Sequence, residues 1–210
     1  MKRGKFIALE GGEGTGKSTQ SRLLVDALSA QGISAEATRE PGGTEGAEAI
    51  RSLLLSPPGD GWGPRAEALL FAAARADHVE KRIRPALTEG RWIVCDRFVD
   101  SSRAYQGGAG ELGDGAITEL HAFGSEGLRP DLTLVIDVPA ELREQRLALR
   151  DAGGSDAIGG RTSDYHAAVR ESFVTNAASD SSSIVIDGEG TPGDVHDRIM
   201  AAVRPLMVNE

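Results

Sequence analysis

The chain contains one segment that fits the pattern Gly-x4-Gly-Lys-Ser, and it reads Gly11-Gly12-Glu13-Gly14-Thr15-Gly16-Lys17-Ser18. Residues 6–9 before it form an apolar run typical of a buried strand, and apolar side chains recur at helical spacing in residues 23–28 after it. Backbone amides at such a strand-to-helix junction can surround phosphate groups, and the helix N-terminus adds positive partial charge there. The segment therefore predicts a phosphate-binding loop.

Two side chains at the end of this loop have separate expected tasks. Lys17 would neutralise the β and γ phosphates of a bound nucleotide, and Ser18 would help to hold Mg²⁺. We expect the triphosphate of the nucleotide to be bound by Gly11, Gly12, Glu13, Gly14, Thr15, Gly16, Lys17, Ser18 and Thr19.

Composition favours one domain that binds small molecules. The chain has 210 residues, of which 40% are hydrophobic, and this is enough for a single domain over residues 1–210. The net charge of -9 argues against a nucleic acid polymer or an anionic membrane as a partner, because both attract basic surfaces. The single cysteine, Cys95, lies in an apolar run, and the N-terminus has no signal-peptide pattern, so we expect a cytoplasmic protein.

Five strand-like runs alternate with longer helical patterns along the chain. Strands are predicted at residues 6–10, 34–38, 92–96, 132–137 and 183–187. Helices are predicted at residues 17–31, 45–55, 64–89, 114–126, 140–150, 164–178 and 191–207. This alternation predicts an α/β fold with three layers, in which helices cover both faces of a central five-stranded parallel sheet.

Polar residues gather where the first three predicted strands end. They are the phosphate-binding loop, residues 39–44 and the pair Asp96-Arg97. Ligands of open parallel sheets bind beyond the carboxyl ends of the strands, so these segments predict one shared site.

A second glycine-rich segment, residues 151–160, has arginines at both ends. Arg146 and Arg150 precede it and Arg161 follows it. Beside a phosphate-binding loop, this arrangement predicts a mobile lid at about residues 146–165. Without that loop, a disordered solvent loop would be the better interpretation.

A phosphate-binding loop alone leaves small-molecule kinases, GTPases and motor ATPases open. A guanine-binding element of the form Asn/Thr-Lys-x-Asp is missing, because Lys81 is the only lysine after Lys17 and no Asp follows it at that spacing. The adjacent acidic residues that end a strand in motor ATPases are also missing, because Arg97 follows Asp96. A small-molecule kinase is therefore favoured.

The remaining polar segments follow one another in a characteristic order. They read Arg39-Glu40-Pro41-Gly42-Gly43-Thr44, Arg51-Ser52-Leu53-Leu54-Leu55, Phe71-Ala72-Ala73-Ala74-Arg75 and Asp96-Arg97-Phe98-Val99-Asp100-Ser101-Ser102-Arg103-Ala104-Tyr105-Gln106-Gly107. Together with the phosphate-binding loop, these segments resemble the thymidylate kinase family over nearly the whole chain. The resemblance implies a P-loop kinase fold, a homodimer, and transfer of the γ-phosphoryl group of ATP to dTMP, with Mg²⁺, to give ADP and dTDP.

The resemblance also assigns the acceptor side of the site. It implies that Arg51 and Arg97 hold the phosphate of dTMP and that Arg75 reaches the thymine O4. Phe71 would stack on the thymine ring, and Tyr105 would crowd the sugar 2′ position and thereby reject ribonucleotides.

Other polar residues complete the set that the resemblance implies. Ser102 would bond the base edge with Gln106 nearby, and Glu13 matches a carboxylate near the sugar 3′-hydroxyl and magnesium. Ser18 and Asp96 would form the metal site. The full substrate-binding set is Glu13, Glu40, Arg51, Phe71, Arg75, Arg97, Ser101, Ser102, Tyr105 and Gln106.

The resemblance places the catalytic charge partly outside the loop. Family members carry an arginine either inside the phosphate-binding loop or in the lid, and residues 12–15 of this loop include none. Gly160 stands where the lid pattern would have an acidic residue, which leaves open which lid arginine acts. The expected catalytic residues are Lys17, Asp96, Arg97, Arg150 and Arg161, with Arg146 as a third lid candidate.

Alternatives remain at the level of residues and of the whole chain. Taken singly, Phe71 and Tyr105 could be core aromatics. Arg75 could pair with Glu67 or Asp77 on a solvated face. The chain could also phosphorylate another nucleoside monophosphate or a deoxynucleoside, or it could bind nucleotides without turnover.

Overall fold

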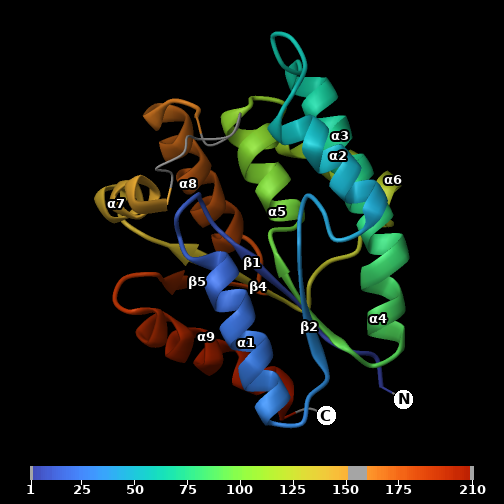
Figure 1. Ribbon diagram of the computed structural model, residues 1–210, viewed down its shortest axis with the longest axis vertical. Helices are drawn as coiled ribbons and strands as arrows, with labels where there is room; N and C mark the ends of the chain where they lie inside the picture. Colours follow the sequence, from blue (N-terminus) through green and yellow to red (C-terminus); the bar gives the residue numbers. More distant parts are fainter. Residues whose placement is uncertain (1, 151–159, 209–210) are drawn as a thin grey trace.

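The computed structural model describes residues 2–150 and 160–208, without the side chains of residues 149 and 150. Its centre is a sheet of five parallel strands in the order β2-β3-β1-β4-β5 (Figure 1). The strands are β1 (Phe6–Glu10), β2 (Ala35–Arg39), β3 (Trp92–Asp96), β4 (Leu132–Asp137) and β5 (Ser183–Asp187). The predicted α/β class and sheet are therefore confirmed, with β2 shifted by one residue.

Alternation along β1 explains why the sheet is covered on both faces. All five side chains of this strand are buried. Ile7 and Leu9 enter one hydrophobic cluster, and Phe6 and Ala8 enter another. Because successive side chains of a strand point to opposite faces, these two clusters lie on opposite sides of the sheet.

The helices form the two outer layers. Helices α1 (Lys17–Ala30) and α9 (Pro192–Met207) pack against each other and supply side chains to the cluster that contains Ile7 (Figure 1). The opposite face is covered by the segments that follow β2 and β3 and by α8. The other elements are α2 (Glu45–Leu55), α3 (Pro64–His78), η1 (Val79–Ile83), α4 (Arg84–Thr88), α5 (Val99–Ser102), η2 (Arg103–Ala109), α6 (Asp114–Ser125), α7 (Ala140–Arg150) and α8 (Ser163–Ala178).

Two π-helical segments depart from the predicted pattern. The helix predicted over residues 64–89 is divided by η1 into α3 and α4. Pro85 follows η1 closely and lacks the amide hydrogen that a regular helical turn requires, which favours an altered register there. The second segment, η2, continues α5 directly after β3, in a region for which no helix bounds were predicted.

The strand ends bring the three predicted polar segments together. Leu9 of β1 pairs with Asp96 of β3, and Arg39 of β2 pairs with the same Asp96. The residues that follow these positions therefore emerge at one edge of the sheet. Within the described residues, none of the helices combines the length and apolar composition that crossing a bilayer requires.

Candidate functional site

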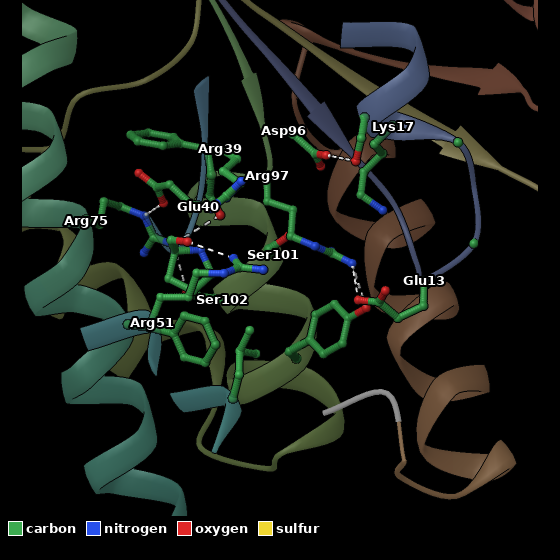
Figure 2. A pocket seen from close by; sticks show the side chains of 18 of the residues that line it. Glu13, Lys17, Arg39, Glu40, Arg51, Arg75, Asp96, Arg97, Ser101 and Ser102 are labelled. Carbon is green, nitrogen blue, oxygen red and sulfur yellow. Dashed lines mark hydrogen bonds and ion pairs between the residues drawn. The ribbon is translucent and has the colours of Figure 1, made fainter. Parts of the chain in front are cut away.

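A cavity of about 660 Å³ lies at this edge of the sheet (Figure 2). Among the predicted site residues whose side chains are described, all line it except Gly11, Gly12, Thr15 and Arg161. The three loop residues lie against a second, much smaller cavity. One cavity thus joins the phosphate-binding loop to the predicted acceptor residues, which come from α2, α3 and the segment after β3.

The side chain of Lys17, at the end of the phosphate-binding loop, contacts the loop itself. Lys17 Nζ donates to the carbonyl of Gly12 at 2.6 Å and lies 3.3 Å from Thr15 Oγ1. Burial, and then the charge of Arg97, lowers the pKa of Lys17 to about 8. Gly11 has φ +131°, and a Cβ there would lie 2.4 Å from the carbonyl oxygen of Ile136, so only glycine permits this close approach.

Ser18 and Asp96 meet beside this loop. Ser18 Oγ donates to Asp96 Oδ2 at 2.5 Å, which joins the first turn of α1 to the end of β3. Both residues line the cavity and offer oxygen atoms, which are the ligands that Mg²⁺ prefers. The donor set therefore fits the magnesium ion implied by the resemblance.

Arg97 is held in an uncommon backbone conformation at the centre of the site. Its φ is +73°, in the left-handed region that non-glycine residues occupy at a cost of roughly 1 kcal/mol or more. Its amide donates to the carbonyl of Leu9 at 2.9 Å. Its guanidinium donates to the carbonyl of Gly11 at 2.9 Å and to Glu13 Oε1 at 2.6 Å. The surroundings thus fix both the backbone and the side chain of Arg97.

Glu10 holds the segment that follows Arg97 by hydrogen bonds, and it was not predicted as a site residue. Its carboxylate accepts hydrogen bonds from the amides of Phe98 and Ser101 at 2.8 and 3.1 Å and from Ser101 Oγ at 2.6 Å. Burial, and then the charge of Asp100, raises the pKa of Glu10 to about 7. The available sequence signal was a carboxylate that ends an otherwise apolar strand just before the glycine-rich loop.

Arg75 lies in a buried polar network rather than on a solvated face. Its side chain is 4% exposed, and its Nε donates to Glu40 Oε2 at 2.7 Å. Its Nη2 donates to Ser102 Oγ at 2.9 Å and to the carbonyl of Phe98 at 3.1 Å. The alternative pairing of Arg75 with Glu67 or Asp77 is therefore wrong.

The remaining acceptor residues surround the same cavity. Arg51 Nη1 donates to the carbonyl of Pro41 at 2.8 Å, and Phe71 is half-buried at the cavity wall. Tyr105 is buried with its ring 6.1 Å from that of Phe173, so it is a core aromatic that also reaches the cavity. Figure 2 shows Arg51, Arg75 and Arg97 around one space.

The three lid arginines have different positions. Arg146 lines the cavity and donates from Nη2 to the carbonyl of Gly188 at 3.1 Å. Arg161 pairs through Nη2 with Glu67 Oε2 at 2.5 Å and does not line the cavity. The Arg150 side chain and residues 151–159 lie outside the described part of the chain. The expectation that Arg150 or Arg161 supplies catalytic charge therefore stays a prediction.

Comparison with known proteins identifies the family of the chain. The sequence profile of the thymidylate kinase family matches residues 9–199. The chain is 53% identical to a thymidylate kinase of Rhizorhabdus wittichii, over 97% of this chain and 99% of that protein. It is 46% identical to thymidylate kinases of Bradyrhizobium diazoefficiens and Nitrobacter hamburgensis, over 98% and 96% of this chain and 91% and 89% of those proteins. On this likeness, the chain belongs to the thymidylate kinase family.

Proposed function

We propose that this chain is a cytoplasmic thymidylate kinase that transfers the γ-phosphoryl group of ATP to dTMP. The products are ADP and dTDP, and dTDP serves dTTP biosynthesis. An oxygen of the dTMP phosphate attacks the γ phosphorus, and the bond from that phosphorus to the β–γ bridging oxygen breaks. The observation that carries this proposal is the single cavity that contains both the phosphate-binding loop and three arginines suited to an acceptor nucleotide.

On the donor side, the loop and Lys17 bind the triphosphate of ATP. Phosphoryl transfer needs little covalent help from a protein, so positioning and charge neutralisation carry most of the catalysis. Lys17 gives up its hydrogen bond to the Gly12 carbonyl and turns to the β and γ phosphates. Mg²⁺, held by Ser18 and Asp96, supplies further neutralisation of phosphate charge when it is bound.

On the acceptor side, arginines hold dTMP at both ends. Arg97 and Arg51 bind its phosphate, because guanidinium groups match phosphate oxygens in charge and geometry. Arg75 and Ser102 meet the edge of the base, and Phe71 packs against the thymine ring. Arg97 exchanges its ion pair with Glu13 for the dTMP phosphate, and the Glu13 carboxylate accepts a hydrogen bond from the sugar 3′-hydroxyl.

The transferred phosphoryl group also needs positive charge that the loop does not supply. We assign this charge to arginines of the predicted lid, residues 146–165. Arg146 supports the assignment because it already lines the cavity. Arg161 would have to leave Glu67 to take part, and Arg150 remains the third candidate.

We further propose that the chain acts as a homodimer. Leu69 on α3 and Phe123 on α6 are 56% and 92% exposed, and these two helices pack against each other. Large exposed apolar side chains on two helices that pack together support a surface that binds another protein. Light scattering after gel filtration of the wild type and of Phe123→Asp would test this, since the variant should shift from dimer to monomer.

An acceptor panel tests the enzymatic function most directly. ADP release is measured with dTMP, dUMP, dCMP, UMP, GMP and thymidine, and Lys17→Ala serves as the blank. We expect dTMP to have the highest kcat/KM. Turnover of dCMP, UMP or GMP without turnover of dTMP would indicate a different monophosphate kinase, and turnover of thymidine alone a deoxynucleoside kinase. No turnover with any acceptor would favour a nucleotide-binding protein without activity.

A further inference from the structure

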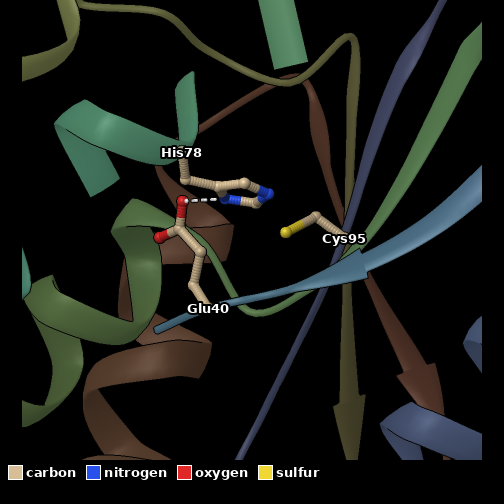
Figure 3. A group of neighbouring side chains, drawn as sticks. All are labelled: Glu40, His78 and Cys95. Atoms are coloured by element: carbon tan, nitrogen blue, oxygen red, sulfur yellow. Dashed lines mark hydrogen bonds and ion pairs between the residues drawn. The ribbon is translucent and has the colours of Figure 1, made fainter. Parts of the chain in front are cut away.

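A buried polar cluster lies behind the acceptor side of the cavity. Glu40, which follows β2, accepts from Arg75 Nε at 2.7 Å and contacts His78 Nδ1 at 3.1 Å. His78 is fully buried, and its Nε2 lies 2.7 Å from Thr38 Oγ1. Figure 3 shows Glu40 and His78 facing each other, with Cys95 on the neighbouring strand.

The same cluster offers three metal-ligand types but does not have the chemistry of a metal site. One ligand atom each from Glu40, His78 and Cys95 lie within 4.8 Å of one another. Both nitrogens of His78 already have partners, and the Cys95 thiol donates to the carbonyl of Arg97 at 3.0 Å. Burial also raises the pKa of the Cys95 thiol well above its ordinary value, which disfavours the thiolate that a metal requires. The cluster is therefore a hydrogen-bond network and not a metal site.

The hydrogen-bond directions within the cluster follow from the charge of Glu40. Burial acts to raise its pKa, but Arg75 and His78 together hold that pKa below its ordinary value. Glu40 is therefore an ionised carboxylate that only accepts, so His78 Nδ1 must carry a proton and donate to it. On the other side of the ring, the Thr38 hydroxyl lies 2.7 Å from Nε2. The ring packs close to Gly43, since a Cβ at that position would lie 2.5 Å from Nε2, and its two nitrogens are held by Glu40 and Thr38.

This network engages two of the three nitrogens of the Arg75 guanidinium. Its Nε donates to Glu40, and its Nη2 donates to Phe98 and Ser102. Within the described residues, Nη1 is the one nitrogen of this guanidinium that has no hydrogen-bond partner, and Arg75 lines the cavity. Arg75 thus lines the cavity with two N–H groups of Nη1 that no described residue engages, while its other nitrogens are fixed.

We propose that His78 is a positioning residue for the choice of the acceptor base. By donating to Oε1 of Glu40, His78 keeps the carboxylate from rotating, and the carboxylate in turn fixes Arg75. The inference rests on the proposed function, in which Arg75 faces the base. Fixed N–H donors favour a ring carbonyl oxygen, as in thymine or uracil. They disfavour an exocyclic amino group, as in cytosine, because the N–H of the arginine then faces the N–H of the amino group and neither has an acceptor.

Removal of His78 should therefore weaken the preference for thymine over cytosine in the acceptor, and the enzyme should still phosphorylate dTMP. Without its donor, Glu40 Oε1 is left buried and unsatisfied, and the carboxylate can turn to find another partner. Arg75 then loses its fixed orientation although its charge remains. The expected signature is weaker discrimination between dTMP and dCMP, while the donor nucleotide is bound as before.

The experiment compares His78→Leu, His78→Asn and the matched control Ile199→Ala. Leucine removes the donor, asparagine restores an N–H near the position of Nδ1, and Ile199 is a fully buried core residue of α9, in the layer on the other face of the sheet. Calorimetry gives the Kd of dTMP and of dCMP, steady-state kinetics with dTMP gives kcat and the KM for ATP, and thermal unfolding gives the stability. Thr38→Val, which removes the hydroxyl next to Nε2, provides a second variant if His78→Leu does not fold.

We expect the Kd for dCMP divided by the Kd for dTMP to fall about tenfold or more in His78→Leu, equivalent to roughly 1.4 kcal/mol of lost discrimination. The asparagine variant should recover most of the ratio, and Thr38→Val should lower it less. Ile199→Ala should lose stability without a change in the ratio. A ratio within twofold of the wild type in His78→Leu, or an equal change in Ile199→Ala, would overturn this inference. A wild type that neither binds nor phosphorylates dTMP would instead overturn the proposed function.

Discussion

Arg97 Nη2 lies 2.6 Å from Glu13 Oε1, and this ion pair joins the end of β3 to the phosphate-binding loop. Both side chains are largely shielded, with exposed fractions of 15% and 23%. The two residues are the ones expected to meet the phosphate and the sugar of dTMP. In this structure they form an ion pair, so we expect the binding of dTMP to exchange one anion at Arg97 for another.

Replacement of Arg97 should weaken the acceptor side selectively. We expect Arg97→Ala to lower kcat/KM for dTMP about a hundredfold, in the range found when a charged transition-state contact is removed. The KM for ATP should change less, because Arg97 is assigned to the acceptor phosphate and its hydrogen bonds to the loop go to Gly11 and Glu13, not to the side chain of the loop lysine. Arg84→Ala is the matched control, since Arg84 pairs with Glu126 outside the cavity and should leave the kinetics unaltered. Equal effects on both nucleotides would contradict the assignment.

Replacement of Lys17 should remove charge from the donor side. We expect Lys17→Ala to lower turnover by at least about a hundredfold. The wild type should also bind ATP with proton uptake above pH 8, because the lysine with a pKa of about 8 must be protonated to attract phosphate. The affinity should then fall by up to about tenfold per pH unit. Calorimetry in two buffers of different ionisation enthalpy measures this uptake, which should be missing in Lys17→Ala.

The lid arginines should affect the chemical step. We expect a lower kcat in Arg150→Ala, in Arg161→Ala, or in both, with little change in dTMP affinity, because the lid is assigned to the transition state. Single-turnover kinetics separates that step from product release. Arg146→Ala tests the third candidate in the same way, and Arg204→Ala on α9 is a control. An unchanged rate in both Arg150→Ala and Arg161→Ala would count against a catalytic role of these two residues.

Glu10 should make stability depend on pH. Its pKa rises from an ordinary value of 4.5 to about 7 on folding, so between these values the folded protein binds more protons than the unfolded chain. The free energy of unfolding should therefore fall as pH rises from 4.5 through 7, by up to about 3 kcal/mol. Glu10→Gln, which stays neutral, should flatten this part of the curve. Urea unfolding between pH 5 and 8 compares the two proteins, and parallel curves would refute the role of this carboxyl.

Much of the fold was predictable because its signals are local. The runs at Phe6–Glu10, Trp92–Asp96 and Leu132–Asp137 are apolar, match the length of a buried strand and end at the predicted residues. The glycine-rich loop stands between a strand and a helix as its spacing requires. The π-helical segments were not predicted, because backbone register within a helix depends on packing around it as well as on periodicity.

The candidate site also has features that the sequence predicts and features that depend on packing. The amino-acid sequence alone determined which segments meet, since parallel strands bring their carboxyl ends to one edge and the motifs follow those ends. Only the tertiary structure decided the pairings: Arg75 with Glu40, 35 positions away; Arg97 with Glu13, 84 away; and Arg161 with Glu67, 94 away. The physical reason is that a buried charge takes as its partner whichever opposite charge the packing brings within hydrogen-bond distance, and distance along the chain does not determine that choice.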